Sequence, residues 1–532
     1  MKRNIIIGFG LSGIAAAVLA TSCLNLDETA YTFIDPYSYY KTEEHMEKAM
    51  TSVYAGFGDL FGSWDPLYAV ELVTSHAMPA HSNKSNVKGF NCWQGVNQET
   101  TYNIDIWDKA YELINRCNVV IGRAPKVEMS DESRDRFYGQ ARFVRAYTMF
   151  TLLRLYGGLA IPESYTAGLE GLEIPRESVS DTYDYIIDDL EYAAEVLPTR
   201  SEWGSEAYYK ISSGAAMALL GDVWLTRACM NDNNEEYLKE SKKWLGNVIE
   251  SKEYDLLPDY RSLWYWFVEE ASKNTVESLL EIQFGATSVN IYNSLHCYFG
   301  INTTDECLGA PMFARAGVSH RDYLSYSDND VRKQCFITEF TATTGVHYFW
   351  EPENKGFAGQ GEGLWPTTSP GNVKFYDRTL SAFETGTAKN NFILMRYSDV
   401  LLNYAEVENL LNGPTDDAYE KLNLVHNRSL PSEPVPSGLD RKAFDDAVYQ
   451  ERVWEEIGEG LLYYDELRTD RLGMTVWEYK TYMYENGYYN CDKLQFVPQR
   501  NFLWKINKTS LDSNPALVQN PDNVSDPRYP LD

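Results

Sequence analysis

Apolar residues recur at three- and four-residue steps along much of this chain, which is the spacing of one face of an α-helix. The longest such stretch runs from Gln140 to Pro162, and its apolar positions cover nearly the whole circumference of the predicted helix. A helix of that kind belongs in an interior, packed between other helices. Ser130 provides an N-cap and Gly157 a stop. We therefore predict a central scaffold helix here rather than a binding site.

Three arginines interrupt this apolar helix, and each needs a carboxylate or carbonyl partner because a buried guanidinium keeps its charge. They are Arg142, Arg145 and Arg154. The helical period also appears elsewhere, and small residues between 213 and 230 allow a neighbouring helix to approach closely. Paired helices with a short turn and small residues at the crossing are typical of tetratricopeptide-like hairpins. Further helices are predicted over 42–60, 107–121, 179–197, 213–230, 235–250, 396–411, 418–428 and 448–470.

Two segments lose the helical pattern, residues 61–100 and about 256–395. Both are rich in Gly, Ser, Asn and aromatic residues, a composition typical of loops. We expect long ordered loops with short strands around 279–284 and 346–350. Irregular stretches of this length in a compact domain are normally functional.

Composition narrows the choice of ligand. Aromatic residues make up 14% of the 532 residues, with 39 Tyr and 13 Trp, and their flat faces suit sugar stacking as well as cores. The formal charge of −30 argues against nucleic acid and anionic lipid surfaces, and weakly against a highly anionic polysaccharide.

The N-terminus has the pattern of a signal peptide over residues 1–22. Lys2 and Arg3 precede an apolar stretch, and Ala-Thr-Ser leads directly to Cys23. We expect Cys23 to be the lipidated first residue of the mature chain, with a net charge of −32 once Lys2 and Arg3 are removed. Ordinary secretion with a structural Cys23 is the alternative. Seven cysteines then remain, none in a C-x-x-C pattern, and most are expected to be buried thiols.

No motif for catalysis or for a resident metal is present. The chain contains no H-E-x-x-H, P-loop or Rossmann glycine pattern. Adjacent carboxylates such as Glu455 and Glu456 are expected on a solvated helix face in a chain with 77 acidic residues. The acidic loop at 327–330 could offer calcium hard oxygen ligands, but its spacing matches no defined calcium loop. We predict neither an enzyme nor a cofactor, and calcium is not assigned.

Several segments resemble the motifs of the SusD/RagB family, the surface glycan-binding lipoproteins of Bacteroidetes starch-utilisation-type systems. ARFVRAYTMFTLLRLYGG resembles the family's ARFLRAxxYFxLxxxYGG, and RYSDVLLNYAEVENLLNG resembles RYADVLLxYAEALN. AYEKLNLVHNRSL, YQERVWEEIGEGLLYYDELR and NPALVQNP resemble further family motifs in the expected order. Two departures are a leucine in place of the arginine that usually follows Glu459-Gly460, and QNPDN in place of QNPGY.

The resemblance implies a mostly α fold in which tetratricopeptide-like hairpins support a loop-rich binding lobe. It implies one domain over 23–532, with the scaffold at about 40–60, 101–255 and 396–475 and the lobe at about 61–100 and 256–395. It further implies a lipid-anchored protein of the outer membrane and cell surface. Such a protein captures a glycan for a TonB-dependent SusC-like transporter and binds no nucleic acid.

Candidate glycan contacts come from the two loop segments, because sugar binding needs an aromatic platform and planar polar groups. Trp93 lies in GFNCWQGVN, where no apolar period draws it into a core, and the family's N-terminal loop commonly contributes to the site. Further hydroxyl partners are His76, Lys84 and Asp65. The candidate contacts are Trp93, Asn97, His81 and Glu71 in the first segment, and Tyr292, Tyr298, Trp350 and Trp365 in the second.

Two other classes of function remain open from the sequence. A helical-repeat scaffold could bind only protein or peptide ligands. The aromatic residues of the loops would then pack against one another and keep the loops ordered. A hydrolase would need paired carboxylates at a glycan. Indifference to every glycan would favour the scaffold, and product release by the purified protein would favour the hydrolase.

Overall fold

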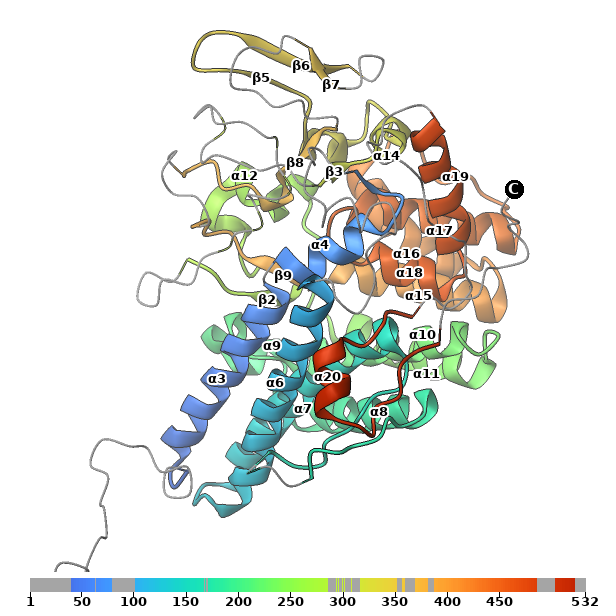
Figure 1. Ribbon diagram of the computed structural model, residues 1–532. Helices are drawn as coiled ribbons and strands as arrows, with labels where there is room; N and C mark the ends of the chain where they lie inside the picture. The colour runs from blue at the N-terminus through green and yellow to red at the C-terminus, as the bar shows by residue number, and fades with distance from the viewer. Residues whose placement is uncertain are drawn as a thin grey trace, which may run out of the picture.

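The chain is mostly helical, as predicted, with short strands gathered at one end (Figure 1). The prediction of tetratricopeptide-like hairpins is confirmed. In the part of the chain that the structure describes, no helix is both long enough and apolar enough to cross a membrane. The computed structural model describes residues 40–62, 64–78, 101–166, 168, 171–285, 293, 295, 299, 301, 308, 316–351, 356–358, 369–380, 387–485 and 503–521.

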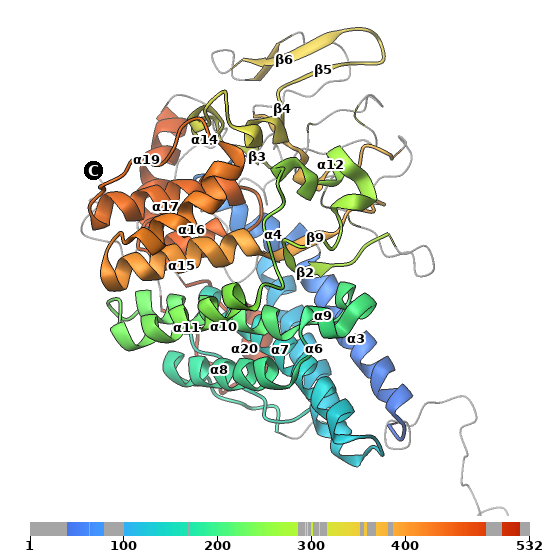
Figure 2. The ribbon, with the colours of Figure 1, turned by 180° about the vertical axis from the view of Figure 1, so that it is seen from behind.

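The helices of the N-terminal half pack in sequence order, each against the next (Figure 2). α7 lies between α6 and α8, α10 between α8 and α11, and α11 carries the stack on to α15. The bounds are α3 Glu43–Phe61, α4 Trp64–Leu72, α6 Thr101–Arg123, α7 Asp131–Tyr156, α8 Val179–Val196, α9 Arg200–Trp203, α10 Ser213–Cys229 and α11 Glu235–Ser251.

α7 is the predicted central helix. The Ser130 hydroxyl accepts a hydrogen bond from the backbone N–H of Ser133 at 3.0 Å, and Gly157 ends the helix with a φ of +79°. Only glycine takes this left-handed conformation without a side-chain penalty. Most of the helix is buried.

The three arginines of α7 find the carboxylate partners that the sequence demanded. Arg145 donates to both oxygens of Asp189 on α8 at 2.8 Å, and Arg142 reaches the same carboxylate at 3.8 Å. Arg154 lies 3.6 Å from Asp222 on α10. Charged side chains thus link the central helix to α8 and to α10.

The crossing of α10 and α11 depends on a small residue. A Cβ added to Gly221 would lie 2.5 Å from the side chain of Leu245. The backbone carbonyl of Gly221 also accepts a hydrogen bond from Ser241 on α11 at 2.7 Å. The predicted close approach at this position is confirmed.

The C-terminal helices differ from prediction in the helix expected over 448–470, and α19 and α20 were not predicted. The sequence predicts one helix over 448–470, but α17 ends at Glu456 and α18 begins only at Leu462. Gly458 and Gly460 between them have φ of +86° and +81°, which no α-helix can contain. The bounds are α15 Tyr397–Asn412, α16 Asp416–Ser429, α17 Arg441–Glu456, α18 Leu462–Arg468, α19 Leu472–Glu485 and α20 Lys508–Ser513.

The strands are short and pair antiparallel, and those predicted around 279–284 and 346–350 are present as β2 and β6. The prediction of loop from residue 61 onward is wrong for α4, a helix too short to show a clear period. Two short helices, α12 Tyr265–Val268 and α14 His320–Ser325, interrupt the strands. The pairs are β1 Ala77–Met78 with β3 Gly317–Val318, β2 Ser278–Ile282 with β9 Phe392–Arg396, and β4 Phe336–Ile337 with β8 Gly371–Asn372; β6 His347–Glu351 lies between β5 Glu339–Thr341 and β7 Gly356–Ala358.

Buried apolar residues form one large core and smaller ones beside it. The large core runs through the helices from α3 to α19. A second core joins residues between Tyr260 and Ile393, among them Trp264 and Trp350. The strand-rich region therefore has apolar packing of its own.

The segment 503–521 runs back across the end of the central helix. The backbone N–H of Trp504 donates to the carbonyl of Leu155 at 2.7 Å, and the Asn520 amide donates to the carbonyl of Tyr156 at 2.9 Å. Arg176 donates to the Asn520 side-chain oxygen at 2.7 Å. Residues more than 300 positions away thus bind the last carbonyls of α7, together with Arg176, which also donates to the Tyr156 carbonyl.

The described cysteines are free thiols, with Cys117 and Cys335 buried and Cys229 half-buried. Burial raises the pKa of each thiol above its ordinary value. These three therefore behave as the sequence predicts, as small apolar residues inside the protein.

Candidate functional site

Most of the predicted glycan contacts lie outside the described residues. These are Trp93, Asn97, His81, Tyr292, Tyr298 and Trp365, together with the lipidation site Cys23 and the hydroxyl partner Lys84. Glu71, His76 and Trp350 can be placed. The structure buries all three.

Glu71 lies in α4 and is only 2% exposed. Its carboxylate accepts a hydrogen bond from the backbone N–H of Gly460 at 2.7 Å, and burial raises the pKa of this carboxyl to about 7. The side chain therefore fastens α4 to the glycine turn between α17 and α18. A sugar hydroxyl cannot reach it there, so this position argues against the predicted role.

Trp350 is 7% exposed and belongs to the second core. Its ring packs edge-on against His320 at 5.0 Å and against Tyr323 at 5.2 Å between centroids. A stacking platform needs an open ring face, which Trp350 lacks. Side chains alternate across a strand, and the opposite face of β6 carries the exposed Phe349 with the His347 ring 6.0 Å away. The sequence interpretation chose the inward residue of this strand and missed the outward ones.

His76 is held between two buried carboxylates. Its ring nitrogens lie 2.9 Å from Asp322 on α14 and 3.1 Å from Glu466 on α18. Although burial opposes the charge, these two carboxylates outweigh it and raise the pKa of His76 to about 10. His76 directly precedes β1, after which the chain enters segment 79–100 with Trp93. The charged imidazolium thus fixes the chain next to that segment.

Glu455 and Glu456 are fully buried, so the expectation of a solvated helix face is wrong. Arg396 on β9 donates to Glu455 and to Glu459 at 2.8 Å, and Arg428 on α16 also binds Glu455. These arginines outweigh burial and hold the pKa of Glu455 far below its usual range. The partners are distant in sequence, which is why local pattern could not reveal them. The pairs tie the strand-rich region to the helical scaffold.

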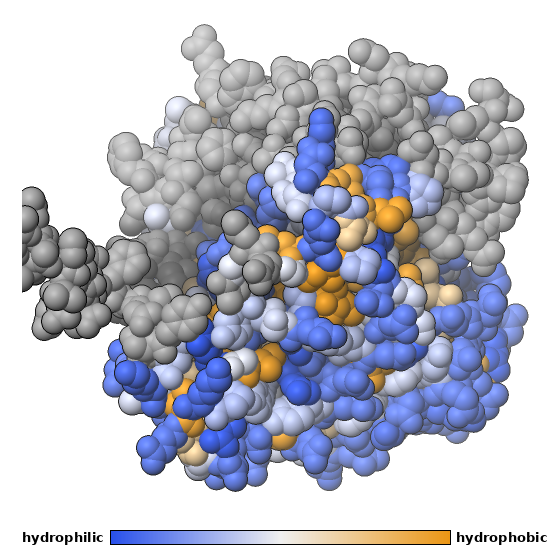
Figure 3. All heavy atoms as spheres, turned by 60° about the horizontal axis from the view of Figure 1, so that its bottom comes forward, coloured by the Kyte–Doolittle hydropathy of each residue, from blue (hydrophilic) through white to orange (hydrophobic). Residues whose placement is uncertain are grey.

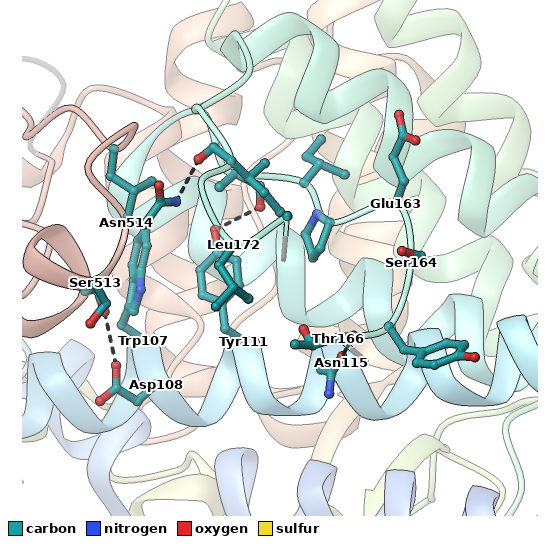
Figure 4. A pocket seen from close by; sticks show the side chains of 18 of the residues that line it. Trp107, Asp108, Tyr111, Asn115, Glu163, Ser164, Thr166, Leu172, Ser513 and Asn514 are labelled. Atoms are coloured by element: carbon teal, nitrogen blue, oxygen red, sulfur yellow. Dashed lines mark hydrogen bonds between the residues drawn. The ribbon is translucent and has the colours of Figure 1, made fainter. Parts of the chain in front are cut away.

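A hollow of about 1260 Å³ lies on the scaffold side (Figure 4). One wall is α6, another is the connection from Ala160 to Glu177, and the third is the segment containing α20. Figure 4 shows Trp107, Tyr111 and Asn115 arranged along α6, facing the connection. They follow one another at four-residue steps on one face of the helix, but the sequence interpretation used Trp107 and Tyr111 only to predict a helix over 107–121 and assigned no site there.

Hydrogen bonds between side chains and backbone hold these walls together. The Tyr111 hydroxyl donates to the carbonyl of Ala160 at 3.1 Å, and the Asn115 oxygen accepts from the Thr166 N–H at 2.8 Å. On the other side, the Asn514 amide donates to the carbonyl of Ile174 at 2.8 Å. These hydrogen bonds join the connection to α6 on one side and to the α20 segment on the other.

The acidic loop at 327–330 is occupied by basic side chains of the chain itself. Asp330 binds Arg332 at 2.8 Å, and Asp328 binds Lys333 at 2.6 Å. Within the described ranges, no cluster of three or more His, Cys, Asp or Glu side chains has the geometry of a metal site.

Comparison with known families gives matches to two family models. Residues 32–225 match the model described as starch-binding and associating with the outer membrane, and residues 314–522 match the model described as SusD family. A curated relative, SusD-like protein P2 of Formosa agariphila, is 23% identical over 487 residues, covering 88% of this chain and 92% of the relative.

Solved structures share the fold. A SusD superfamily protein from Parabacteroides distasonis superposes with a TM-score of 0.74 at 24% identity, covering 90% of this chain and 99% of that one. Surface glycan-binding protein A from Bacteroides thetaiotaomicron, solved in complex with laminarihexaose, superposes with a TM-score of 0.70 at 20% identity, covering 90% of this chain and 100% of that one.

Proposed function

The chain belongs to the SusD family, and from that premise we propose that it captures a glycan at the cell surface and delivers it to a TonB-dependent SusC-like outer-membrane transporter. The observation that carries the proposal is the whole-length likeness to surface glycan-binding proteins, one of them bound to laminarihexaose. The role is binding without catalysis. The mature protein is anchored in the outer membrane through a lipid on Cys23.

The contacts proposed for the glycan are the loop residues Trp93, Asn97 and His81, with Tyr292, Tyr298 and Trp365 from the second segment. Trp93 is the expected platform because its loop is rich in amides and glycine. The buried pairs around His76 and Glu455 support this assignment, since they hold the chain next to both loop segments rigidly. Rigid supports place binding side chains on loops accurately.

Removing the platform tests the proposal. Trp93→Ala should weaken binding to the preferred glycan about thirtyfold, or roughly 2 kcal/mol, because a stacked aromatic is a hot spot. The affinity is measured by calorimetry after affinity electrophoresis against a panel of polysaccharides. Unfolding temperature is recorded in parallel, since a buried tryptophan would instead cost about 3–5 kcal/mol of stability.

Trp244 on α11, which packs partly buried against the large core, provides the matched control. Trp244→Ala should lower the unfolding temperature and leave the affinity unchanged. If Trp93→Ala keeps full affinity, the platform lies at another aromatic residue. If the wild-type protein binds none of the glycans in the panel, it is instead a scaffold for protein or peptide ligands.

The transporter partnership has its own test. A tagged chain extracted gently from the outer membrane should co-purify with a SusC-like transporter. A chain that always elutes alone would contradict the pairing, whatever its affinity for glycans.

A further inference from the structure

We propose that the hollow between α6, the 160–177 connection and the α20 segment is a second carbohydrate-binding site, which accepts neutral sugars and rejects uronate or sulfated chains (Figure 4). The inference rests on the proposed function, because it adds a second glycan contact to a glycan-binding protein. It differs from the loop site in every residue.

Size is the first argument. At about 1260 Å³ the hollow exceeds the roughly 300–1,000 Å³ of typical small-molecule pockets, so it has room for more than one sugar ring. Its walls are linked by the hydrogen bonds of Tyr111, Asn115 and Asn514, so little ordering is needed when a ligand enters. Preorganisation of this kind raises affinity by lowering the entropy cost of binding.

The lining has the mixture that sugars require. Tyr111 is half-buried and offers aromatic surface, while Trp107 is 3% exposed and supports Tyr111 from 4.9 Å. Tyr165 is also half-buried, and the Arg123 guanidinium covers one side of its ring at 4.6 Å from the centroid. Hydroxyl and amide side chains border these rings, including Ser164 and Ser513. Aromatic faces stack on C–H groups of a sugar, and the polar groups bind its hydroxyls.

The surface around the hollow is partly apolar. Leu172 on the rim is 40% exposed, and Val518, next to the lining residue Leu517, is 71% exposed. Figure 3 looks at the molecule from below and shows hydrophobic side chains gathered in the middle of that face, with hydrophilic ones around them. A mixed surface of this kind fits a polysaccharide, whose sugar rings have both apolar and hydroxylated faces.

Charge decides which sugars fit. Among the residues that the structure describes, the lining contains the carboxylates of Asp108, Glu163 and Glu177 and no lysine, arginine or histidine. Asp108 is occupied in part, because it accepts hydrogen bonds from Ser510 at 3.3 Å and Asn507 at 3.2 Å. The other two carboxylates are exposed and repel anions. The Arg123 guanidinium is stacked on the Tyr165 ring, 4.6 Å from its centroid, and is not itself a lining residue. A uronate or sulfate group would therefore meet carboxylates at the lining, whereas neutral hydroxyls can donate to these oxygens.

Hydrogen exchange of the mature protein, followed by mass spectrometry, separates this site from the loop site. The probes are laminarihexaose, cellohexaose, maltohexaose and xylohexaose, with hexagalacturonate as the acidic counterpart. At least one neutral hexasaccharide should slow exchange several-fold in peptides covering 160–177 and 508–517, in addition to 79–100. Hexagalacturonate should slow none of the peptides around the hollow.

Two matched variants localise the effect. Leu172→Trp adds bulk at the rim and should abolish protection around the hollow while leaving protection at 79–100 intact. Leu324→Trp adds the same bulk at an exposed leucine on α14, away from the hollow, and should change neither. Because both leucines are at least 40% exposed, neither variant should impair folding.

The possible failures are distinguishable. Protection confined to 79–100 would overturn the second site and leave the proposed function standing. Equal protection by hexagalacturonate and a neutral sugar would overturn the charge selectivity. No protection in any peptide by any neutral probe would overturn both the second site and glycan binding.

Discussion

The strongest stability prediction concerns His76. Replacing it would leave two buried carboxylates without the cation that they share. The side chains of His76, Asp322 and Glu466 are 1%, 5% and 0% exposed. In a His76→Leu variant, Asp322 keeps Arg321 at 3.1 Å, so its charge remains paired. Glu466 keeps neutral hydrogen bonds, from the Tyr449 hydroxyl at 2.6 Å and from Thr475.

The expected loss follows from this asymmetry. Removing one partner of a buried ion pair costs about 3–5 kcal/mol. Two pairs are broken here, but Arg321 continues to neutralise Asp322, so the total should stay within about 3–5 kcal/mol rather than double. A urea titration followed by circular dichroism measures the free energy of unfolding of both proteins.

His347 provides the control, because it is exposed and lies 3.6 Å from Glu339, which is more exposed still. His347→Leu should change the free energy of unfolding by no more than about 0.5 kcal/mol. The comparison separates the loss of a buried charge from the general effect of replacing histidine by leucine.

The pH dependence gives a second, independent readout. The two carboxylates raise the pKa of His76 from its ordinary 6.5 to about 10, against the effect of burial. A raised pKa means that its stabilisation is complete below about pH 6.5 and is lost as the pH rises through about 10. The difference between wild type and His76→Leu should therefore shrink over this range. A loss below about 1 kcal/mol, or a difference that stays constant from pH 6 to 10, would refute the reasoning.

Two further predictions concern helix packing and anchoring. Gly221→Ala should cost about 1–3 kcal/mol, because its Cβ would overlap Leu245. Gly246→Ala on the facing helix, where the nearest atom is 3.8 Å away, should instead gain up to about 1 kcal/mol of helix propensity; equal effects in urea titrations would contradict the packing at this crossing. Palmitate labelling of the cells should mark the wild-type protein and vanish in Cys23→Ala, and an unlabelled, freely secreted wild type would contradict the lipid anchor.

The helical scaffold could be predicted from sequence because its determinants are local. The Ser130 cap and the Gly157 stop of α7 lie at the ends of one continuous apolar pattern, and the structure confirms both. The break between α17 and α18 could have been inferred from the glycines at 458 and 460. The apolar pattern continues on both sides of them, however, and a left-handed backbone leaves no trace in hydrophobic spacing.

The candidate site was harder to predict because its determinants are spread through the chain. Glu455 was predicted to be solvated because its partners are distant in sequence: Arg396 lies on a strand and Arg428 on a different helix. Trp350 looked like a binding aromatic because composition does not say which face of a strand is covered. The wall of the hollow on α6 could have been recognised only by knowing that the 160–177 connection lies over Tyr111.

The return of segment 503–521 to the end of α7 has a consequence for biosynthesis. Arg176, only 20 positions from Tyr156, already donates to the Tyr156 carbonyl, but the Leu155 carbonyl receives its hydrogen bond from the N–H of Trp504, which the ribosome adds near the end of the chain. A chain that ends before segment 503–521 therefore leaves the Leu155 carbonyl, at the end of a buried helix, without this donor. Truncated chains should fold less stably than the full chain and be more open to proteases.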